Sequence, residues 1–248
     1  VAALLLLEAG YDVTGATMSL GVHRDAGSPG RFTDEAIDDA KRVCSDLGIG
    51  HTTFFYADLM EEKVIGAFIR EYTRGRTPNP CIECNRHLKF GALMQKTRDL
   101  GFDYLATGHF ARIERKDESW RLLRAVDKTK DQSYFLYGIR PDDLRTILFP
   151  LGALTKDEVR RKADESGLHV AHRPESQDIC FVPDGDYTRV FEKRGVRPEP
   201  GEIVDAQGNV LGRHRGIIHY TIGQRGGLGV SAKRPLYVRR LDARTHRV

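Results

Sequence analysis

VAALLLLEAGYDVTGATM, residues 1–18, places an apolar helix directly before a β-rich run. Gly10 is a typical residue for a helix end, and Val13, Thr14 and Thr17 favour an extended strand. The same alternation continues to residue 107. The sequence predicts helices from Thr33 to Gly48, from Asp58 to Tyr72 and from Leu88 to Leu100, and strands over Tyr11–Met18, Ile49–Tyr56 and Phe102–Thr107. Helices and strands that alternate in this way predict an α/β fold with a doubly wound parallel sheet.

The pattern loosens after residue 107. A loop is predicted over Gly75–Asn85, a hairpin over 111–125, helices over 155–166 and 187–194, and strands over 201–205, 209–211 and 236–241. The change in character predicts domain boundaries near residues 184 and 234.

The composition is that of a folded globular chain. Of its 248 residues 40% are hydrophobic and 30% are charged, which excludes a disordered tail, a collagen or a coiled coil. The longest apolar run, Val1–Leu7, is too short for a bilayer, which needs about 20 residues. No charged segment precedes that run in this sequence, so we do not expect it to be a signal peptide.

Charge is unevenly distributed. Residues 185–248 contain 13 Lys and Arg against 6 Asp and Glu, a net charge of +7. Residues 1–184 contain 26 against 29, a net charge of −3. A basic C-terminal part favours a polyanionic partner, although a solubilising surface would have the same composition.

Four cysteines are present. Cys44 lies inside a predicted helix and is expected to be a small core residue. Cys81 and Cys84 form a CxxC motif in the predicted loop, and Asn85 is expected to cap the following helix. A thiol near a helix N-terminus has a lowered pKa, which predicts reactive thiolates here. Cys180 lies in a polar turn before an apolar stretch.

The pattern of these cysteines leaves two kinds of chemistry open. A structural zinc site is disfavoured because it needs four ligands and no second pair is present. A thioredoxin-like redox pair would lack its usual neighbours and leave Cys180 unused. An iron–sulfur cluster on Cys81, Cys84 and Cys180 is chemically reasonable. So is a nucleophile with a partner thiol that carries sulfur as a persulfide.

Three further segments are candidates for binding. Gly108-His109 follows a predicted strand, where ligands of doubly wound sheets bind. Lys130-Asp-Gln-Ser-Tyr134 is a polar cluster, and residues 219–229, HYTIGQRGGLG, mix glycine with basic and aromatic side chains. That mixture suits contact with nucleic acid, but a glycine-rich hairpin would have the same composition.

Taken together, these segments resemble the tRNA-specific 2-thiouridylase (MnmA/TrmU) family. The resemblance rests on five motifs in the family's order: Thr77-Pro-Asn-Pro-Cys-Ile-Glu-Cys-Asn85 with Lys89-Phe90, Ala106-Thr-Gly-His109, Lys130–Tyr134, Glu175-Ser-Gln-Asp-Ile-Cys180 and His219–Gly229. It implies an adenine nucleotide alpha-hydrolase-like fold of the PP-loop ATPase type over 1–184. A small central α+β domain over 185–234 and the start of a β-barrel over 235–248 follow.

The resemblance also implies an activity and its residues. The activity is 2-thiolation of the wobble uridine of tRNA in the cytoplasm, with ATP and Mg²⁺ and with a cysteine desulfurase or sulfur-relay protein as donor. Cys84 would be the nucleophile and Cys180 the persulfide carrier, with a transient disulfide between them. The remaining residues implied are Met18 and Gly108 for ATP, Asn79, Pro80 and Cys81 for the target base, and His109, Lys130, Asp131 and Gln132 for tRNA.

The chain departs from the family in two ways. Cys81 stands where many members have Asp, so the acid/base residue is open and an iron–sulfur thiolase using three cysteines stays an alternative. The family's pyrophosphate loop, of Ser-Gly-Gly-Val-Asp-Ser-Ser type, would lie just before Val1. We therefore expect a piece of a longer protein that cannot adenylate RNA as given. A non-catalytic tRNA-binding remnant is the other alternative.

Overall fold

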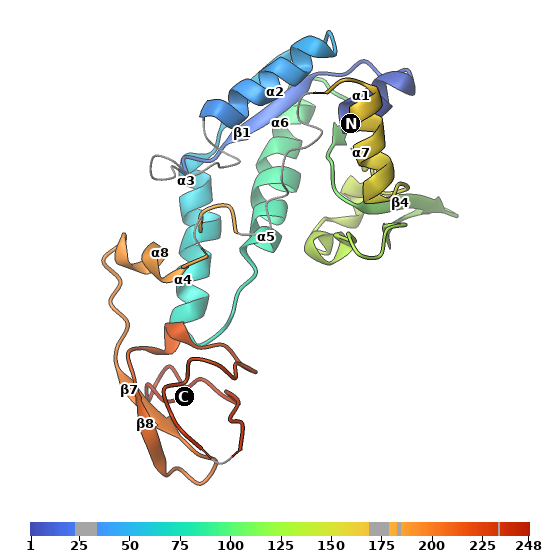
Figure 1. The fold of residues 1–248 in the computed structure, drawn as a ribbon. Helices are drawn as coiled ribbons and strands as arrows, with labels where there is room; N and C mark the ends of the chain where they lie inside the picture. Colours follow the sequence, from blue (N-terminus) through green and yellow to red (C-terminus); the bar gives the residue numbers. More distant parts are fainter. Residues whose placement is uncertain (23–33, 169–178, 183–184, 233) are drawn as a thin grey trace. The chain divides into compact units, whose positions relative to one another are not determined.

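A computed structural model describes residues 1–22, 34–168, 179–182, 185–232 and 234–248. The chain forms two compact units (Figure 1): the first contains Val1–Lys63 and Cys81–Cys180, and the second Val64–Pro80 and Phe181–Val248. The predicted helix cap Thr33 and the motif residues Glu175–Asp178 lie outside the described residues. No helix in the described ranges is long and apolar enough to cross a membrane.

The elements of the first unit alternate as the sequence predicts. The α-helices are α1 (Ala2–Glu8), α2 (Asp34–Asp46), α3 (Ala57–Leu59), α6 (Met94–Asp99) and α7 (Lys156–Glu165), with α5 (Pro80–Glu83) beginning at the unit's edge. The strands are β1 (Gly15–Ser19), β2 (His51–Phe55), β3 (Leu105–Ala106), β4 (Ala111–Lys116), β5 (Ser119–Arg124) and β6 (Ile147–Leu148). Short 3₁₀ helices η3 (Ser133–Leu136) and η4 (Pro141–Thr146) precede β6.

The strands pair in parallel, as an α/β fold requires. β1 pairs with β2 from Gly15↔His51 to Ser19↔Phe55, and β3 pairs with β6. In the described part of the chain these are two separate two-stranded pairs rather than one continuous sheet. The predicted strand 102–107 is reduced to Leu105–Ala106. The predicted hairpin is confirmed, since β4 and β5 are antiparallel around the turn at Asp117, whose φ is +54°.

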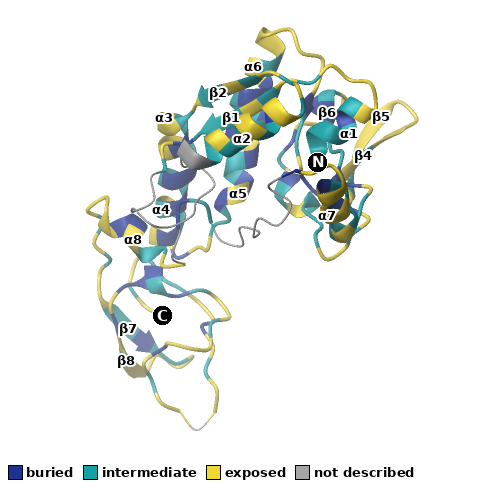
Figure 2. Cartoon of the chain, turned by 45° about the horizontal axis from the view of Figure 1, so that its top comes forward, coloured by how far each residue is buried: buried dark blue, intermediate teal, exposed yellow. Residues whose placement is uncertain are grey.

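One hydrophobic cluster joins both parallel pairs. It contains Met94 of α6, Leu105 of β3 and Ile147 of β6, and Met18 and Phe54 of the other pair pack against it. A second cluster packs α1 and α7 around Phe110 and Leu151. Figure 2 shows the resulting pattern, in which buried residues gather between elements and the hairpin β4–β5 extends as an exposed arm.

Helix boundaries follow local chemistry where capping groups are present. Helix α7 begins with a capping box, in which Thr155 accepts from the Glu158 N–H at 3.3 Å and Glu158 accepts from the Thr155 N–H at 2.7 Å. Cys44 is buried in α2, as predicted, and a side chain at Gly15 would collide with its sulfur. Asp58, however, is not a cap: it lies in the first turn of α3, whose N-cap is Tyr56.

The second unit contains its own core. Its elements are α4 (Gly66–Thr73), α8 (Thr188–Glu192), β7 (Gly201–Val204), β8 (Val210–His214) and the 3₁₀ turn η5 (Ile217–His219). Phe68 and Tyr72 of α4 pack on Phe181, Tyr187 and Phe191, with the Tyr72 and Tyr187 rings stacked at 4.7 Å. A π-helical segment, η1 (Met60–Ile65), leads into α4.

The last residues differ from the prediction. Residues 236–241 were expected to form a strand, but no strand is assigned there. Instead Val238 exchanges main-chain hydrogen bonds with Gly223 and Gln224, at 2.7 and 2.9 Å. Val238 is buried with Ile203 in one cluster, against which Leu236 packs. The alternation of apolar residues therefore reports burial of one face and not a regular strand. The boundary near residue 234 stays a prediction.

Candidate functional site

The CxxC motif lies on a helix and not in a loop. Pro80 is the first residue of α5, a position that suits proline because it needs no N–H there. Cys81 follows it, and Cys84 opens a π-helical segment, η2 (Cys84–Leu93), that continues into α6. In Figure 1 these segments form one continuous helical rod. The predicted loop over Gly75–Asn85 was therefore wrong at its C-terminal end.

Asn85 is a core residue rather than the expected helix cap. Its side chain is buried, and its Nδ2 donates a hydrogen bond to the main-chain oxygen of Phe135 at 3.0 Å. Its Oδ1 is buried with no hydrogen-bond partner among the described residues. The amide thus ties the cysteine-bearing helix to η3.

The structure brings the predicted reactive thiols together. Cys180 interacts electrostatically with Cys84 and with Cys81, although it is far from both in the sequence. Cys81 is exposed, and Cys84 and Cys180 are half-buried. All four cysteines are free thiols, so the transient disulfide between Cys84 and Cys180 stays a prediction.

Burial reverses the expected effect of the helix on the thiols. Desolvation raises the pKa of Cys84, and Cys81 raises it further. The pKa of Cys180 is raised to about 12, first by burial and then by Cys84 and Cys81. The lowered pKa expected for the CxxC thiols was therefore wrong for Cys84. The reason is that taking an anion out of water outweighs the favourable field of a helix end.

Lys89 completes the cluster, and our sequence reasoning did not single it out as a functional residue. It lowers the pKa of both Cys84 and Cys180. Its Nζ lies 3.3 Å from Nε2 of His109, and the His109 Nδ1 lies 2.7 Å from the Thr107 Oγ1. The sequence did contain a signal for this role: Lys89 lies five residues after Cys84, in the Lys89-Phe90 pair that accompanies the cysteine motif.

His109 is buried, although it was predicted to contact tRNA. Only 9% of its surface is exposed, and its ring packs against Phe90 and Phe149 at 5.9 Å from each. Its two ring nitrogens point to Thr107 and Lys89. The direct contacts of His109 in this structure are thus with protein, and its contact with tRNA stays a prediction.

The described residues contain no group of three or more His, Cys, Asp or Glu side chains placed to hold a metal ion. Cys81, Cys84 and Cys180 share a neighbourhood, but they are not arranged as ligands of one cluster here.

Met18 and Gly108 are predicted to contact ATP, and parallel strands position both of them. Met18 lies near the carboxyl end of β1, half-buried against the cluster that contains Leu105 of β3. Gly108 is exposed just after β3, and a Cβ there would meet only the Leu151 side chain at 3.5 Å. Packing leaves room for a ligand at the Gly108 main chain, where α/β folds bind nucleotides.

The Lys130–Gln132 segment is held to the protein by its own side chains. Asp131 accepts hydrogen bonds from the Ala125 N–H at 2.9 Å and from the Ser133 hydroxyl at 2.9 Å. Gln132 bonds Phe110 twice, once through its N–H and once through Oε1. Asp131 and Gln132, both predicted to contact tRNA, thus fix the shape of the loop that contains the half-buried Lys130.

Two exposed tyrosines lie at this loop: Tyr134, which ends the Lys130–Tyr134 motif, and Tyr137, to which the sequence analysis gave no role. Tyr134 is 65% exposed and Tyr137 is 62% exposed. The Arg86 guanidinium lies 5.9 Å from the centre of the Tyr137 ring. An exposed aromatic ring with an arginine beside it suits stacking with nucleic-acid bases.

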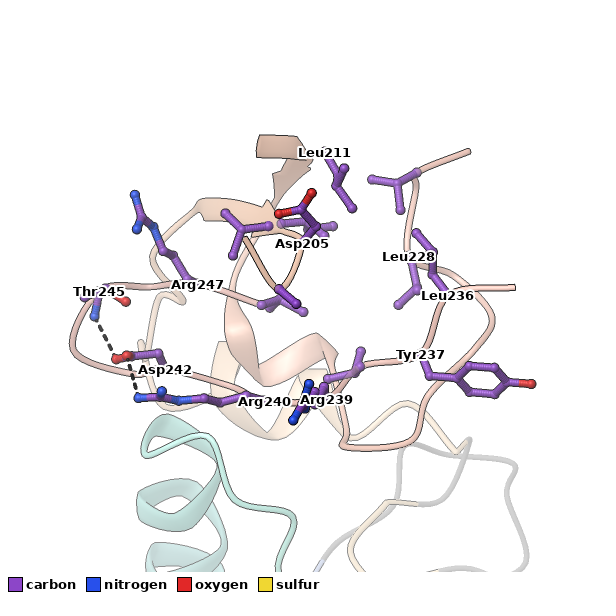
Figure 3. Close-up of a pocket in the computed structure, with 16 residues that line it drawn as sticks. Asp205, Leu211, Leu228, Leu236, Tyr237, Arg239, Arg240, Asp242, Thr245 and Arg247 are labelled. Atoms are coloured by element: carbon purple, nitrogen blue, oxygen red, sulfur yellow. Dashed lines mark hydrogen bonds and ion pairs between the residues drawn. The ribbon is translucent and has the colours of Figure 1, made fainter. Parts of the chain in front are cut away.

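Asn79 lies in the second unit, directly before α5, and the same unit contains a cavity. The cavity measures about 880 Å³ and is lined mainly by apolar side chains, including Leu228, Leu236 and Val238 (Figure 3). At its edge Asp242 accepts a hydrogen bond from Arg240 at 3.1 Å. None of the predicted site residues lines this cavity.

Residues 219–229 form turns and not a hairpin, since no strand is assigned over them. The segment begins at the last residue of η5, and its Tyr220 and Leu228 side chains are buried.

Comparisons with known proteins cover the whole chain. A family model described as "tRNA methyl transferase HUP domain" matches residues 1–184. A second, described as "tRNA methyl transferase PRC-barrel domain", matches residues 189–248. The first match is that of an α/β fold of the PP-loop ATPase type, which confirms the predicted fold class.

The chain is similar to curated proteins that are named tRNA-specific 2-thiouridylase MnmA. "tRNA-specific 2-thiouridylase MnmA 1" of Syntrophus aciditrophicus is 54% identical over 98% of this chain and 65% of its own length. The MnmA proteins of Acetivibrio thermocellus and Carboxydothermus hydrogenoformans are 47% and 48% identical over the whole chain and over 71% and 70% of their own lengths. The chain thus spans about two thirds of the relatives it matches. On this similarity, and on the motifs and thiols described above, the chain belongs to the tRNA-specific 2-thiouridylase (MnmA) family.

Proposed function

We propose that this chain forms the sulfur-transfer core of a tRNA-uridine 2-sulfurtransferase. The observation that supports it best is the meeting of Cys84 and Cys180 at one half-buried site. Two free thiols from distant parts of the sequence are what a persulfide carrier and its partner nucleophile require. The names of the relatives supply the substrate, a uridine of tRNA.

The proposed reaction has three displacements, at phosphorus, at carbon and at sulfur. The uracil C2 oxygen attacks the α-phosphorus of ATP, and pyrophosphate leaves. The terminal sulfur of a Cys180 persulfide then attacks C2, and the C2–O bond breaks as AMP departs. The Cys84 thiolate attacks the Cys180 sulfur, the S–S bond breaks, and the electron pair stays with the sulfur now on the ring. A Cys84–Cys180 disulfide remains, which a thiol reductant returns to two thiols.

The remaining residues support this reaction. Met18 and Gly108 lie at the ends of β1 and β3, where the nucleotide would bind, with Mg²⁺ on its phosphates. Asn79, Pro80 and Cys81 would face the target base, which must leave its stack to react. Lys130, Asp131, Gln132 and His109 would contact or shape the tRNA-binding surface. The sulfur would come from a cysteine desulfurase or a relay protein, in the cytoplasm.

Persulfide loading tests the proposal without requiring the full reaction. The chain is incubated with cysteine and a cysteine desulfurase, digested and examined by mass spectrometry. We expect one added sulfur atom on the Cys180 peptide, absent in Cys180→Ser and retained in Cys44→Ser, the matched buried control. An adduct shared equally with Cys44, or none on Cys180, contradicts the proposal. RNA binding without any adduct would favour the non-catalytic remnant.

The substrate is tested on a full-length protein that contains this chain. Its tRNA product is hydrolysed, and 2-thiouridine is measured by liquid chromatography and mass spectrometry. We expect Cys84→Ser and Cys180→Ser each to abolish 2-thiouridine and Cys44→Ser to preserve it. Retained 2-thiouridine in Cys180→Ser would remove the assignment of the persulfide carrier.

A further inference from the structure

Lys89 is the cation that acts on both sulfurs within the described part of the site. It favours the anionic form of Cys84 and of Cys180, whereas burial and the neighbouring Cys81 disfavour it. Nearby on the same helix, the Glu83 carboxylate is engaged by Arg86 at 3.6 Å and by His87 at 3.2 Å.

The winding of the helix places Lys89 near Cys84. In an α-helix, a residue five positions further on lies about 140° around the axis, on another face. Residues Cys84–Leu93 are π-helical, and the i→i+5 hydrogen bond of a π-helix places residue i+5 nearly above residue i. The π segment therefore turns Lys89 onto the face that carries Cys84. Such segments are frequent at functional sites.

Thr107 and His109 hold the ammonium in place. An ammonium group has no acceptor, so Lys89 donates to the His109 Nε2 at 3.3 Å. His109 is then neutral, with its proton on Nδ1, which donates to the Thr107 Oγ1 at 2.7 Å. Phe90 and Phe149 fix the plane of the ring. These contacts fix one side of the ammonium.

The chemistry of the site needs such a charge. Sulfur attacks as an anion, which burial disfavours and a nearby cation favours. We propose that Lys89 is a positioning residue of the sulfur site, held by Thr107 and His109, whose ammonium stabilises the negative charge on the reacting sulfur of Cys84 or Cys180. This inference rests on the proposed function for the identity of the reacting sulfurs.

Thiol alkylation tests the role of Lys89 without tRNA, ATP or a sulfur donor. The full chain is treated with iodoacetamide from pH 6.5 to 10, and peptide mass spectrometry gives a rate for each cysteine. In Lys89→Met we expect slower alkylation of Cys84 and Cys180, about tenfold at neutral pH for each unit by which the thiol pKa rises. Lys89→Arg should restore the rates. Lys96→Met, which removes an exposed charge from α6, is the matched control and should match the wild type.

The outcomes separate this inference from the proposed function. Identical pH profiles for Lys89→Met and wild type, at equal melting temperature, overturn the role of Lys89. If Lys89→Met does not fold, Lys89→Gln is measured against the same criterion. If the profiles shift but the full-length protein makes no 2-thiouridine, the role of Lys89 stands and the proposed function fails.

Discussion

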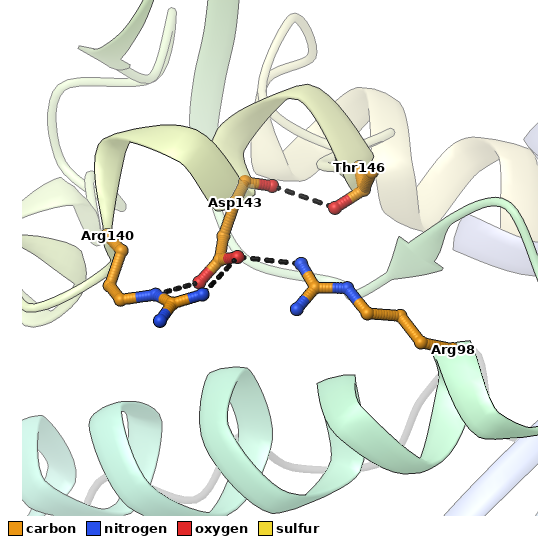
Figure 4. Close-up of polar contacts among 4 residues, drawn as sticks. All are labelled: Arg98, Arg140, Asp143 and Thr146. Carbon is orange, nitrogen blue, oxygen red and sulfur yellow. Dashed lines mark hydrogen bonds and ion pairs between the residues drawn. The ribbon is translucent and has the colours of Figure 1, made fainter.

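Asp143 is a buried polar residue that we predict to stabilise the first unit. Its side chain is 6% exposed on the 3₁₀ helix η4, and it joins two arginines (Figure 4). Its Oδ1 accepts from Arg98 of α6 at 2.6 Å, and Arg140 donates to both carboxylate oxygens at 2.9 and 3.1 Å. The Asp143 main-chain oxygen accepts from the Thr146 hydroxyl at 3.0 Å.

The substitution Asp143→Asn keeps the shape but removes the charge, and it turns an N–H₂ group toward a guanidinium donor. Breaking a fully buried ion pair costs about 3–5 kcal/mol, whereas exposed pairs contribute about 0–1 kcal/mol. Arg98 is 37% exposed and Arg140 is 73% exposed, so both can return to water. We therefore expect a loss of about 2 kcal/mol in the free energy of unfolding, below the fully buried range.

The pH dependence gives a second signature. Hydrogen bonds from Arg140, first, and from Arg98 lower the pKa of Asp143 from its usual value of 3.8. A lowered pKa in the folded state means that the stabilisation is complete above about pH 5 and is lost as the pH falls through the lowered pKa of the folded state. The difference in the free energy of unfolding between wild type and Asp143→Asn should thus be constant from pH 5 to 8 and shrink toward pH 3.

Urea unfolding followed by far-ultraviolet circular dichroism measures both effects. Asp142→Asn, on the same turn but exposed, is the matched control and should unfold like the wild type. If Asp143→Asn unfolds at the same urea concentration as Asp142→Asn at pH 7, the cluster does not stabilise the fold as argued. A difference that persists unchanged at pH 3 would contradict the electrostatic explanation.

Three further outcomes are expected from urea unfolding. Gly152→Ala should destabilise the fold strongly because its Cβ would lie 1.7 Å from the Ala111 oxygen, whereas Gly50→Ala, whose Cβ meets one methyl group at 3.9 Å, should be near neutral. Asn85→Ala should cost about 1 kcal/mol, since the main-chain carbonyl of the half-buried Phe135 loses its side-chain donor; an unchanged midpoint would show that this carbonyl finds water. The raised pKa of Cys180, about 12 against 9.0 when unfolded, predicts that stability falls as the pH rises above 9, and that Cys180→Ser weakens this fall.

The sequence by itself determined the order of elements and the family. Alternating helix and strand signals predicted α1, β1, α2 and β2 within a few residues, because local propensity and apolar periodicity act over short stretches. The capping box at Thr155 and the stop at Gly10 were predictable for the same reason. The two most informative cysteines, Cys84 and Cys180, were also chosen from the sequence.

Local signals failed where contacts from distant segments decide the outcome. The helix that begins at Pro80 was predicted to begin at Leu88, because the two prolines and Asn85 suggested a loop. Asn85 is instead held in the helix by the Phe135 carbonyl. Residues 236–241 alternate like a strand, yet they lack a continuous strand partner and bury one face in a small cluster.

The electrostatics of the site were likewise decided by tertiary structure. A helix terminus alone predicts a lowered thiol pKa, but burial among other residues raises the pKa of Cys84 and of Cys180. The sequence determined which residues can react, since that depends on their own chemistry. Only the fold decided that Cys180 and Lys89 lie beside Cys84, because desolvation and charge act through space and not along the chain.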